Sequence, residues 1–232
     1  MRLSPAVFVA AVMACCLCSP AFAAFSFLED FSTGAANWKQ DSAGTTDLVF
    51  ASTGGPSNDS YVTRDLTLGA YTPPSMFGPA ATIVFRGQQN FNSSNAAFAG
   101  NWLSAGVTSV SAYVRHNASV PLAYTFRLAD PANTPGASYL TTEVPSNVWT
   151  KLTVDVTSTS PQNLTYGGST YNGVFDNIGN IQISAVIPVG WQGGVPITFD
   201  LDRVEVAVPE PASLAIIASS LAGLALVARR RR

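Results

Sequence analysis

Strict alternation of apolar and polar side chains constrains the fold of this chain more than any other feature. It is clearest over residues 110–115, 122–128, 151–156 and 181–187, where every second side chain is apolar. A period of two is the period of a strand with one face buried. Six further segments carry strand-like patterns: residues 25–31, 47–51, 60–64, 82–86, 138–143 and 197–206.

Turn signals separate these segments, among them Gly54-Gly55-Pro56, Tyr71-Thr72-Pro73-Pro74 and Thr134-Pro135-Gly136. Between residues 24 and 207 we find no amphipathic helix and no repeat. About ten short strands without helical crossovers are typical of antiparallel sheets packed face to face. The sequence therefore predicts an all-β fold, an antiparallel β-sandwich of the jelly-roll type, over residues 24–207.

The first 23 residues have the three parts of a secretory signal peptide. Arg2 supplies the positive charge, residues 6–17 form an apolar core, and Ala21 and Ala23 are the small residues before cleavage. The core is too short to span a bilayer, which needs ~20 residues. We expect cleavage after Ala23.

The last 25 residues, 208–232, also have three parts. Pro209, Glu210 and Pro211 precede an uncharged run over residues 212–228, and Arg229, Arg230, Arg231 and Arg232 follow it. Seventeen helical residues span about 25 Å, the lower limit for a transmembrane helix. Arginines behind such a helix stay in the cytoplasm, so the sequence predicts a membrane helix over 212–228 with the preceding domain outside.

This arrangement resembles the PEP-CTERM sorting signal of Gram-negative bacteria. The resemblance implies recognition at the inner membrane by an exosortase, cleavage near Pro-Glu-Pro, and transfer to the cell envelope or to extracellular polysaccharide. It covers only the C-terminal segment and implies a location, not an activity.

Charge and cysteine content restrict what the central domain can do. Residues 24–207 contain 13 Asp and Glu against seven Lys and Arg, a net charge of −6. Nucleic acid is an unfavourable partner for such a domain, since its binding depends on neutralising phosphates. All three cysteines, Cys15, Cys16 and Cys18, lie in the signal peptide, so the domain lacks disulfides and thiol nucleophiles.

Three short motifs are similar to exported jelly rolls of the laminin B and carbohydrate-binding-module type. They are Glu29-Asp30-Phe31 with Asn37-Trp38, Val148-Trp149-Thr150-Lys151-Leu152, and residues 199–206. The resemblance implies that the first and last strands lie together in one sheet.

We expect no enzymatic activity. His116 is the only histidine, placed at a strand end and predicted to be solvated, and no Gly-x-Ser-x-Gly elbow accompanies it. Zinc spacing is absent. A pair of carboxylates for glycoside hydrolysis stays open because acidic residues are scattered along the chain, which leaves a secreted hydrolase as an alternative.

Acidic residues near both ends of the domain predict a structural Ca²⁺ site. Glu29 and Asp30 would meet Asp200 and Asp202 if the terminal strands pair, and Ca²⁺ prefers oxygen ligands. Asp202 is in phase with the apolar residues after it and would face inward, unless a bulge separates the two halves of the strand. Pairing with Arg203 or with backbone amides is the alternative to calcium.

The four tryptophans fall into two pairs. Trp38 and Trp149 lie in strand-like sequence and are predicted to be packed, whereas Trp102 and Trp191 lie in loop-like sequence. An exposed loop tryptophan beside Asn or Gln could stack on a sugar ring, while the alternative is a loop pinned to the core. The sequence thus predicts an exported, non-catalytic β-sandwich that binds a ligand, such as polysaccharide, or acts as a structural matrix component.

Overall fold

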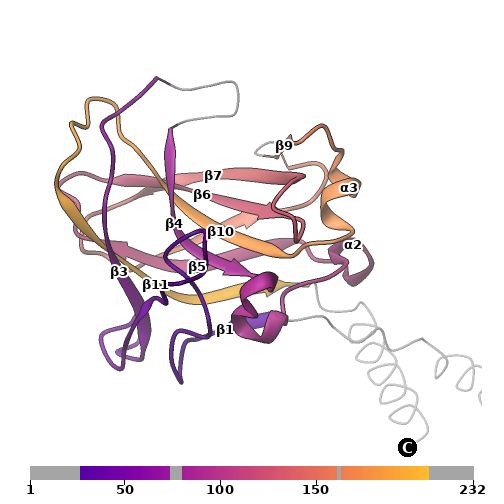
Figure 1. Ribbon diagram of the computed structural model, residues 1–232, viewed down its shortest axis with the longest axis horizontal. Coiled ribbons are helices and arrows are strands. Elements are labelled where there is room, and N and C mark those ends of the chain that lie inside the picture. Colours follow the sequence, from indigo (N-terminus) through magenta and orange to yellow (C-terminus); the bar gives the residue numbers. More distant parts are fainter. Residues whose placement is uncertain (1–26, 74–79, 161–162, 209–232) are drawn as a thin grey trace, which may run out of the picture. The chain divides into compact units, whose positions relative to one another are not determined.

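The computed structural model describes residues 27–73, 80–160 and 163–208, which fold into two antiparallel sheets packed as layers (Figure 1). The first sheet has the order β2 (Val49–Ala51), β3 (Tyr61–Thr67), β11 (Pro196–Ala207), β5 (Ser109–His116) and β8 (Thr150–Asp155), with β1 (Phe27–Glu29) also paired to β11. The second has the order β4 (Ala81–Gln88), β10 (Asn180–Val186), β6 (Leu122–Ala129), β7 (Gly136–Val144) and β9 (Leu164–Tyr166). The predicted antiparallel, jelly-roll-like sandwich is confirmed.

Each of the ten predicted strand segments coincides with a strand of the structure. The prediction missed β9, which has only three residues, too few for a period to show. It also missed the one-turn helices α2 (Trp102–Ala105) and α3 (Tyr171–Phe175) and the 3₁₀ turns Gln89–Phe91 and Ser93–Ala96.

Within the described residues, no helix combines the length and the apolar character that crossing a membrane requires. The predicted membrane helix 212–228 and the predicted signal peptide 1–23 both lie outside the described residues.

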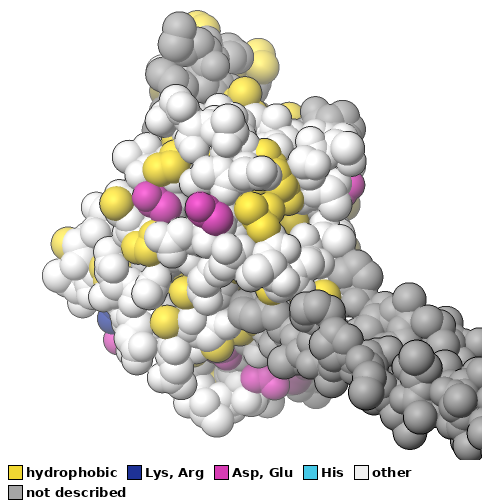
Figure 2. Space-filling model, turned by 90° about the vertical axis from the view of Figure 1, so that its right-hand side faces the viewer, with side chains coloured by type: hydrophobic (Ala, Val, Ile, Leu, Met, Phe, Trp, Pro, Cys, Tyr) yellow, Lys and Arg dark blue, Asp and Glu magenta, His cyan; other side chains and the backbone are white. Residues whose placement is uncertain are grey.

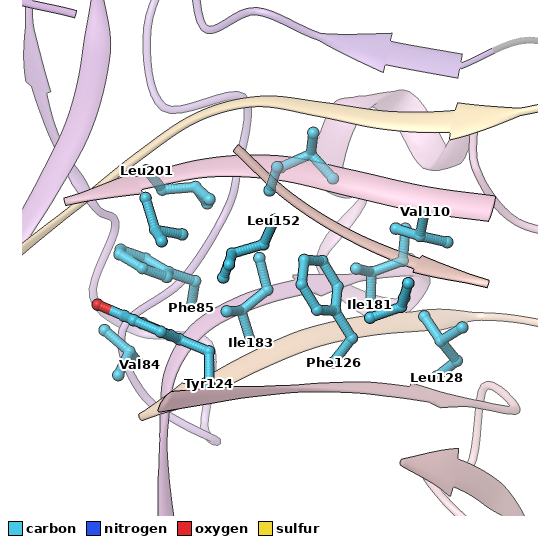
Figure 3. Packing of buried hydrophobic residues seen from close by; sticks show 14 of the residues in the cluster. Val84, Phe85, Val110, Tyr124, Phe126, Leu128, Leu152, Ile181, Ile183 and Leu201 are labelled. Atoms are coloured by element: carbon cyan, nitrogen blue, oxygen red, sulfur yellow. The ribbon is translucent and has the colours of Figure 1, made fainter. Parts of the chain in front are cut away.

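The core lies between the two sheets and follows from the alternation in the sequence. Figure 3 shows Phe126 and Ile183 of the second sheet pointing toward Leu152 and Leu201 of the first, and all four side chains are buried. Close packing of two such inner faces is what stabilises a sandwich that lacks disulfides.

The strand β1 pairs with the end of β11, with Phe27 opposite Val206. This confirms that the first and last strands share a sheet. Consequently both ends of the domain lie at one end of the sandwich, and β11 leads from the opposite end to Val208.

A bulge in β11 decides the direction of Asp202. The register shifts between Asp202 and Glu205, and Arg203 has a φ of 49°. Leu201 lies opposite the core residue Val114, so the next pair, Asp202 and Tyr113, faces the outer side of the sheet. Asp202 therefore does not face the core between the sheets, although it is fully buried on the outer side. The alternative of a bulge is correct, because one extra residue keeps the apolar residues on both sides of it in the core.

Candidate functional site

A hollow at one end of the sandwich contains Trp191, one of the two tryptophans predicted to stack on a sugar ring. Its volume is about 400 Å³, and it lies between the loop after β5, the loop before β11 and the first residues of β11. We call it the Trp191 hollow. It is lined by Asn117, Ala118, Ser119, Val120, Gly190, Trp191, Gln192, Gly193, Val195, Pro196 and Ile197. None of these side chains carries a charge.

Trp191 is half-buried and packs against the core. Two backbone hydrogen bonds fix its position: its N–H donates to Pro188 O at 3.0 Å, and its carbonyl accepts from the Tyr71 N–H at 2.8 Å. Its indole Nε1–H is buried and has no hydrogen-bond partner among the described residues. The loop therefore holds one broad aromatic side chain at the wall of the hollow.

The loop can approach the chain after β3 because residue 193 is glycine. Gly193 has a φ of 75°, and a Cβ there would lie 2.9 Å from Ala70 N and 3.2 Å from Leu68 O. Gly190 has a similar φ of 80° but open space around it.

We expect Gly193→Ala to destabilise the protein by about 2 kcal/mol and Gly190→Ala by about 1 kcal/mol, because both strain a left-handed residue and only the first adds a backbone clash. Urea unfolding measures both. Equal losses would show that the clash is relieved by movement of the loop.

Neutral polar groups complete the hollow. Asn117 Nδ2 donates to Thr198 Oγ1 at 3.3 Å, and its Oδ1 accepts from Thr198 N at 2.9 Å. One amide hydrogen and one lone pair of Asn117 are left over. Gln192 Nε2 donates to Gly190 O at 2.8 Å, and the side chain is otherwise exposed. The hollow thus offers an aromatic wall beside uncharged donors and acceptors.

Trp102, the other predicted sugar-stacking residue, is not available to a ligand. It is 1% exposed in α2, and its Nε1 donates to Phe98 O at 2.7 Å. Asn101 caps this helix by accepting from Ser104 N, so loop-like sequence turns the indole into the core. Only Trp191 of the predicted pair stays a candidate.

The four carboxylates predicted to bind calcium do not form a set of ligands. Glu29 and Asp30 accept hydrogen bonds from the backbone two residues further on, and Asp200 pairs with Arg115 Nε at 2.7 Å. Asp202 accepts from Arg203 N at 2.7 Å. In residues 27–73, 80–160 and 163–208 no three His, Cys, Asp or Glu side chains are grouped as metal ligands. The backbone contacts of Glu29, Asp30 and Asp202 are the amide contacts that the sequence offered as the alternative, whereas the pairing of Asp200 with Arg115 was not predicted.

His116 is buried, with 1% of its surface exposed, and the prediction of a solvated ring is wrong. Its Nε2–H donates to Val144 O at 3.0 Å, and its Nδ1 accepts from Ala118 N at 3.1 Å. Burial lowers the pKa of His116. A neutral ring with both nitrogens bound to backbone groups braces two loops and is not free to act as a general base.

Several solved structures are similar in shape to this domain, at low sequence identity. A family 11 carbohydrate-binding module from Clostridium thermocellum, solved with a β-1,3-1,4-mixed-linked tetrasaccharide, is 14% identical with a TM-score of 0.44, over 79% of this chain and 95% of the module. The CBM22-1–GH10 modules of xylanase 10B from the same organism are 11% identical, with a TM-score of 0.44. The match covers 78% of this chain but only 28% of the xylanase chain. A putative sugar-binding protein from Bacteroides thetaiotaomicron is 11% identical, with a TM-score of 0.35, over 76% of this chain and 91% of that protein.

Residues 207–232 match the model of the PEP-CTERM protein-sorting motif, which contains the predicted Pro209, Glu210 and Pro211 and the four terminal arginines. The predicted sorting signal is thereby confirmed. The motif implies an exported, membrane-anchored precursor that is processed by an exosortase and sorted to the cell envelope. No curated protein matches the chain by sequence.

Proposed function

We propose that this protein is a non-catalytic glycan-binding protein of the cell envelope or extracellular polysaccharide, and that the Trp191 hollow is its binding site. The observation that carries the proposal is the fixed, half-exposed indole of Trp191 beside the spare amide groups of Asn117 and Gln192. Binding sites for small polar molecules commonly combine an apolar wall with a few placed polar groups.

The uncharged lining favours neutral sugars. The domain carries a net charge of −6, so acidic polysaccharides are repelled, and the lining provides no cation to offset that repulsion. On the face of the domain shown in Figure 2, uncharged side chains predominate, with a few acidic side chains among them. Hydroxyl and amide groups are suited to hydrogen bonding with sugar hydroxyls.

The position of the hollow supports display on a surface. It lies where β11 begins, whereas the sorting motif follows the end of β11. Twelve residues of strand span about 35 Å. A ligand at the hollow would thus be far from the point where the domain continues into its sorting segment, both before and after processing.

Retention on polysaccharides tests the proposal. We expect the full chain, purified in detergent, to be retarded in gels containing at least one of xylan, mixed-linkage β-glucan, mannan and dextran. Trp191→Ala should weaken retention at least about tenfold, because it removes the stacking surface.

Val189→Ala is the matched control, since Val189 is 84% exposed in the same loop and does not line the hollow. It should leave retention unchanged. Absence of retention on every polymer would refute glycan binding and leave the structural matrix role, and release of reducing ends would instead indicate a hydrolase.

A further inference from the structure

A second hollow adjoins the first on the outer face of the sheet that contains β11. Its volume is about 350 Å³. It is lined by Tyr61, Thr63, Arg115, His116, Asn117, Asn147, Thr198 and Asp200. We call it the Arg115 hollow. The prediction from sequence did not include it, because its residues come from three strands and two loops far apart in the chain.

Strand register brings these side chains onto one face. Asp200 of β11 lies opposite Thr63 of β3 on one side and opposite Arg115 of β5 on the other. Their neighbours Val62, Val114 and Leu201 are core residues, so this row points outward. Tyr61, two residues before Thr63, lies on the same face. Strands therefore position Tyr61, Thr63, Arg115 and Asp200, while loops contribute Asn117 and Asn147.

Arg115 is held in place by contacts on several sides. Its Nε donates to Asp200 Oδ2 at 2.7 Å, and Asp200 is almost fully buried. Its guanidinium carbon lies 4.6 Å from the ring centre of Trp149 and 5.2 Å from that of Tyr61. Trp149 Nε1 donates to Gly54 O at 2.9 Å, which locks that ring in turn. Trp149, predicted to be packed, is thus half-buried on this outer face.

This arrangement leaves a hollow that is polar but compensated in charge. The cation of Arg115 is paired with the carboxylate of Asp200, and its Nη1 also donates to Gly54 O at 3.4 Å, which leaves part of its five guanidinium hydrogens to donate. Asn147 stands on the rim with an exposed amide, anchored by its backbone N–H to His116 O at 2.6 Å. Such a set of fixed donors and acceptors suits a neutral, hydroxyl-rich ligand better than an anion.

The two hollows meet at Asn117, which lines both. Asn117 is hydrogen-bonded to Thr198, and Thr198 Oγ1 in turn donates to Asp65 Oδ1 at 2.7 Å. A linear ligand that occupied both hollows would therefore pass the hydrogen-bonded side chain of Asn117.

We infer that the Arg115 hollow is a second subsite, in which the sugar units that follow the one at Trp191 bind by hydrogen bonds. This inference rests on the proposed function and specifies its ligand class: internal stretches of a neutral linear oligosaccharide, long enough to fill both hollows. Short fragments bind at Trp191 alone and more weakly.

Titration with xylo-oligosaccharides and mixed-linkage gluco-oligosaccharides of two to six units tests the inference on the full chain in detergent. Affinity should rise with length until both hollows are filled. Asn147→Ala and Tyr61→Phe, which remove one polar group each, should weaken binding of the longest fragment about 2- to 13-fold, the usual effect of a lost hydrogen bond, and leave the shortest unchanged.

Val148→Ala is the control, because Val148 is exposed beside Asn147 and does not line the hollow. Affinity that is independent of length, or variants that weaken short and long fragments equally, would overturn the second subsite while glycan binding stands. Absence of binding to all fragments in the wild type would instead overturn the proposed function itself.

Discussion

Gly87→Ala should destabilise the domain by about 3 kcal/mol, although it adds a single methyl group. Gly87 lies in β4, and a Cβ there would be 2.5 Å from Cζ2 and 2.6 Å from Cη2 of Trp38. Trp38 is fully buried, donates from Nε1 to Ser94 Oγ at 2.9 Å, and meets Phe31 edge-on with ring centres 5.8 Å apart. The indole cannot withdraw without losing these contacts, so the added methyl overpacks the core.

Trp38→Phe removes the ring atoms that the methyl group would strike. Alone it should cost about 2 kcal/mol, from a small cavity and the lost hydrogen bond to Ser94. Together with Gly87→Ala it should cost less than the sum of the two, with a coupling energy of about 1–2 kcal/mol in urea unfolding.

Gly69→Ala is the control for the first prediction, since a Cβ at Gly69 meets nothing within 4 Å. It should change the free energy of unfolding little. Additive effects of Gly87→Ala and Trp38→Phe would contradict the steric explanation.

Asp202→Asn should stabilise the protein at pH 8.5 and leave it nearly unchanged at pH 4. Asp202 is fully buried, and its Oδ2 has no hydrogen-bond partner among the described residues, with Arg203 Nε 3.7 Å away. Burial raises the pKa of Asp202 from its ordinary 3.8 to about 7. The folded state thus binds this proton more tightly than the unfolded state does.

Because the folded state binds this proton more tightly, the free energy of unfolding falls as the pH rises. The stabilisation that comes from protonated Asp202 is complete below about pH 4, declines between pH 4 and 7, and is lost above pH 7. Asparagine stays neutral, so the gain at pH 8.5 should be about 2–4 kcal/mol, since a tenfold change in proton affinity corresponds to about 1.4 kcal/mol.

The two proteins should be compared by urea unfolding in EDTA at each pH. His116 has a lowered pKa and so destabilises the fold as the pH falls below about 6.5, but this effect is common to both and cancels in the difference. A difference that is the same at both pH values would show that Asp202 is not buried as a neutral acid. Added Ca²⁺ that stabilises only the wild type would support the calcium prediction.

The sequence predicted the sheets well because alternation is a local property. Residues 122–128 and 181–187 show which side of each strand is apolar before any partner is known, and ten of the eleven strands in the part of the chain that the structure describes were found in this way. The three-residue strand Leu164–Tyr166 and the helix Trp102–Ala105 were missed because neither contains a full period of a repeating pattern.

The candidate site could be predicted only in part. Trp191 was chosen for its glycine-rich loop, and the structure gives it a hollow with Asn117 and Gln192. Trp102 was wrongly predicted to be available to a ligand, because exposure depends on what packs over a ring, whereas Trp149, predicted to be packed, is half-buried against Tyr61 and Arg115. The cap at Asn101 turns Trp102 inward, and the strand register leaves Trp149 beside Arg115 on an outer face.

By itself the sequence determined the sorting signal, because a processing enzyme recognises a contiguous motif. It also determined the layered β fold, because each strand shows its own alternation of apolar and polar residues. Only the tertiary structure decided which side chains share a surface. Tyr61, Arg115 and Asp200 meet because β3, β5 and β11 are neighbours in one sheet. Hydrogen-bond register between distant segments, which no local pattern encodes, produced that juxtaposition.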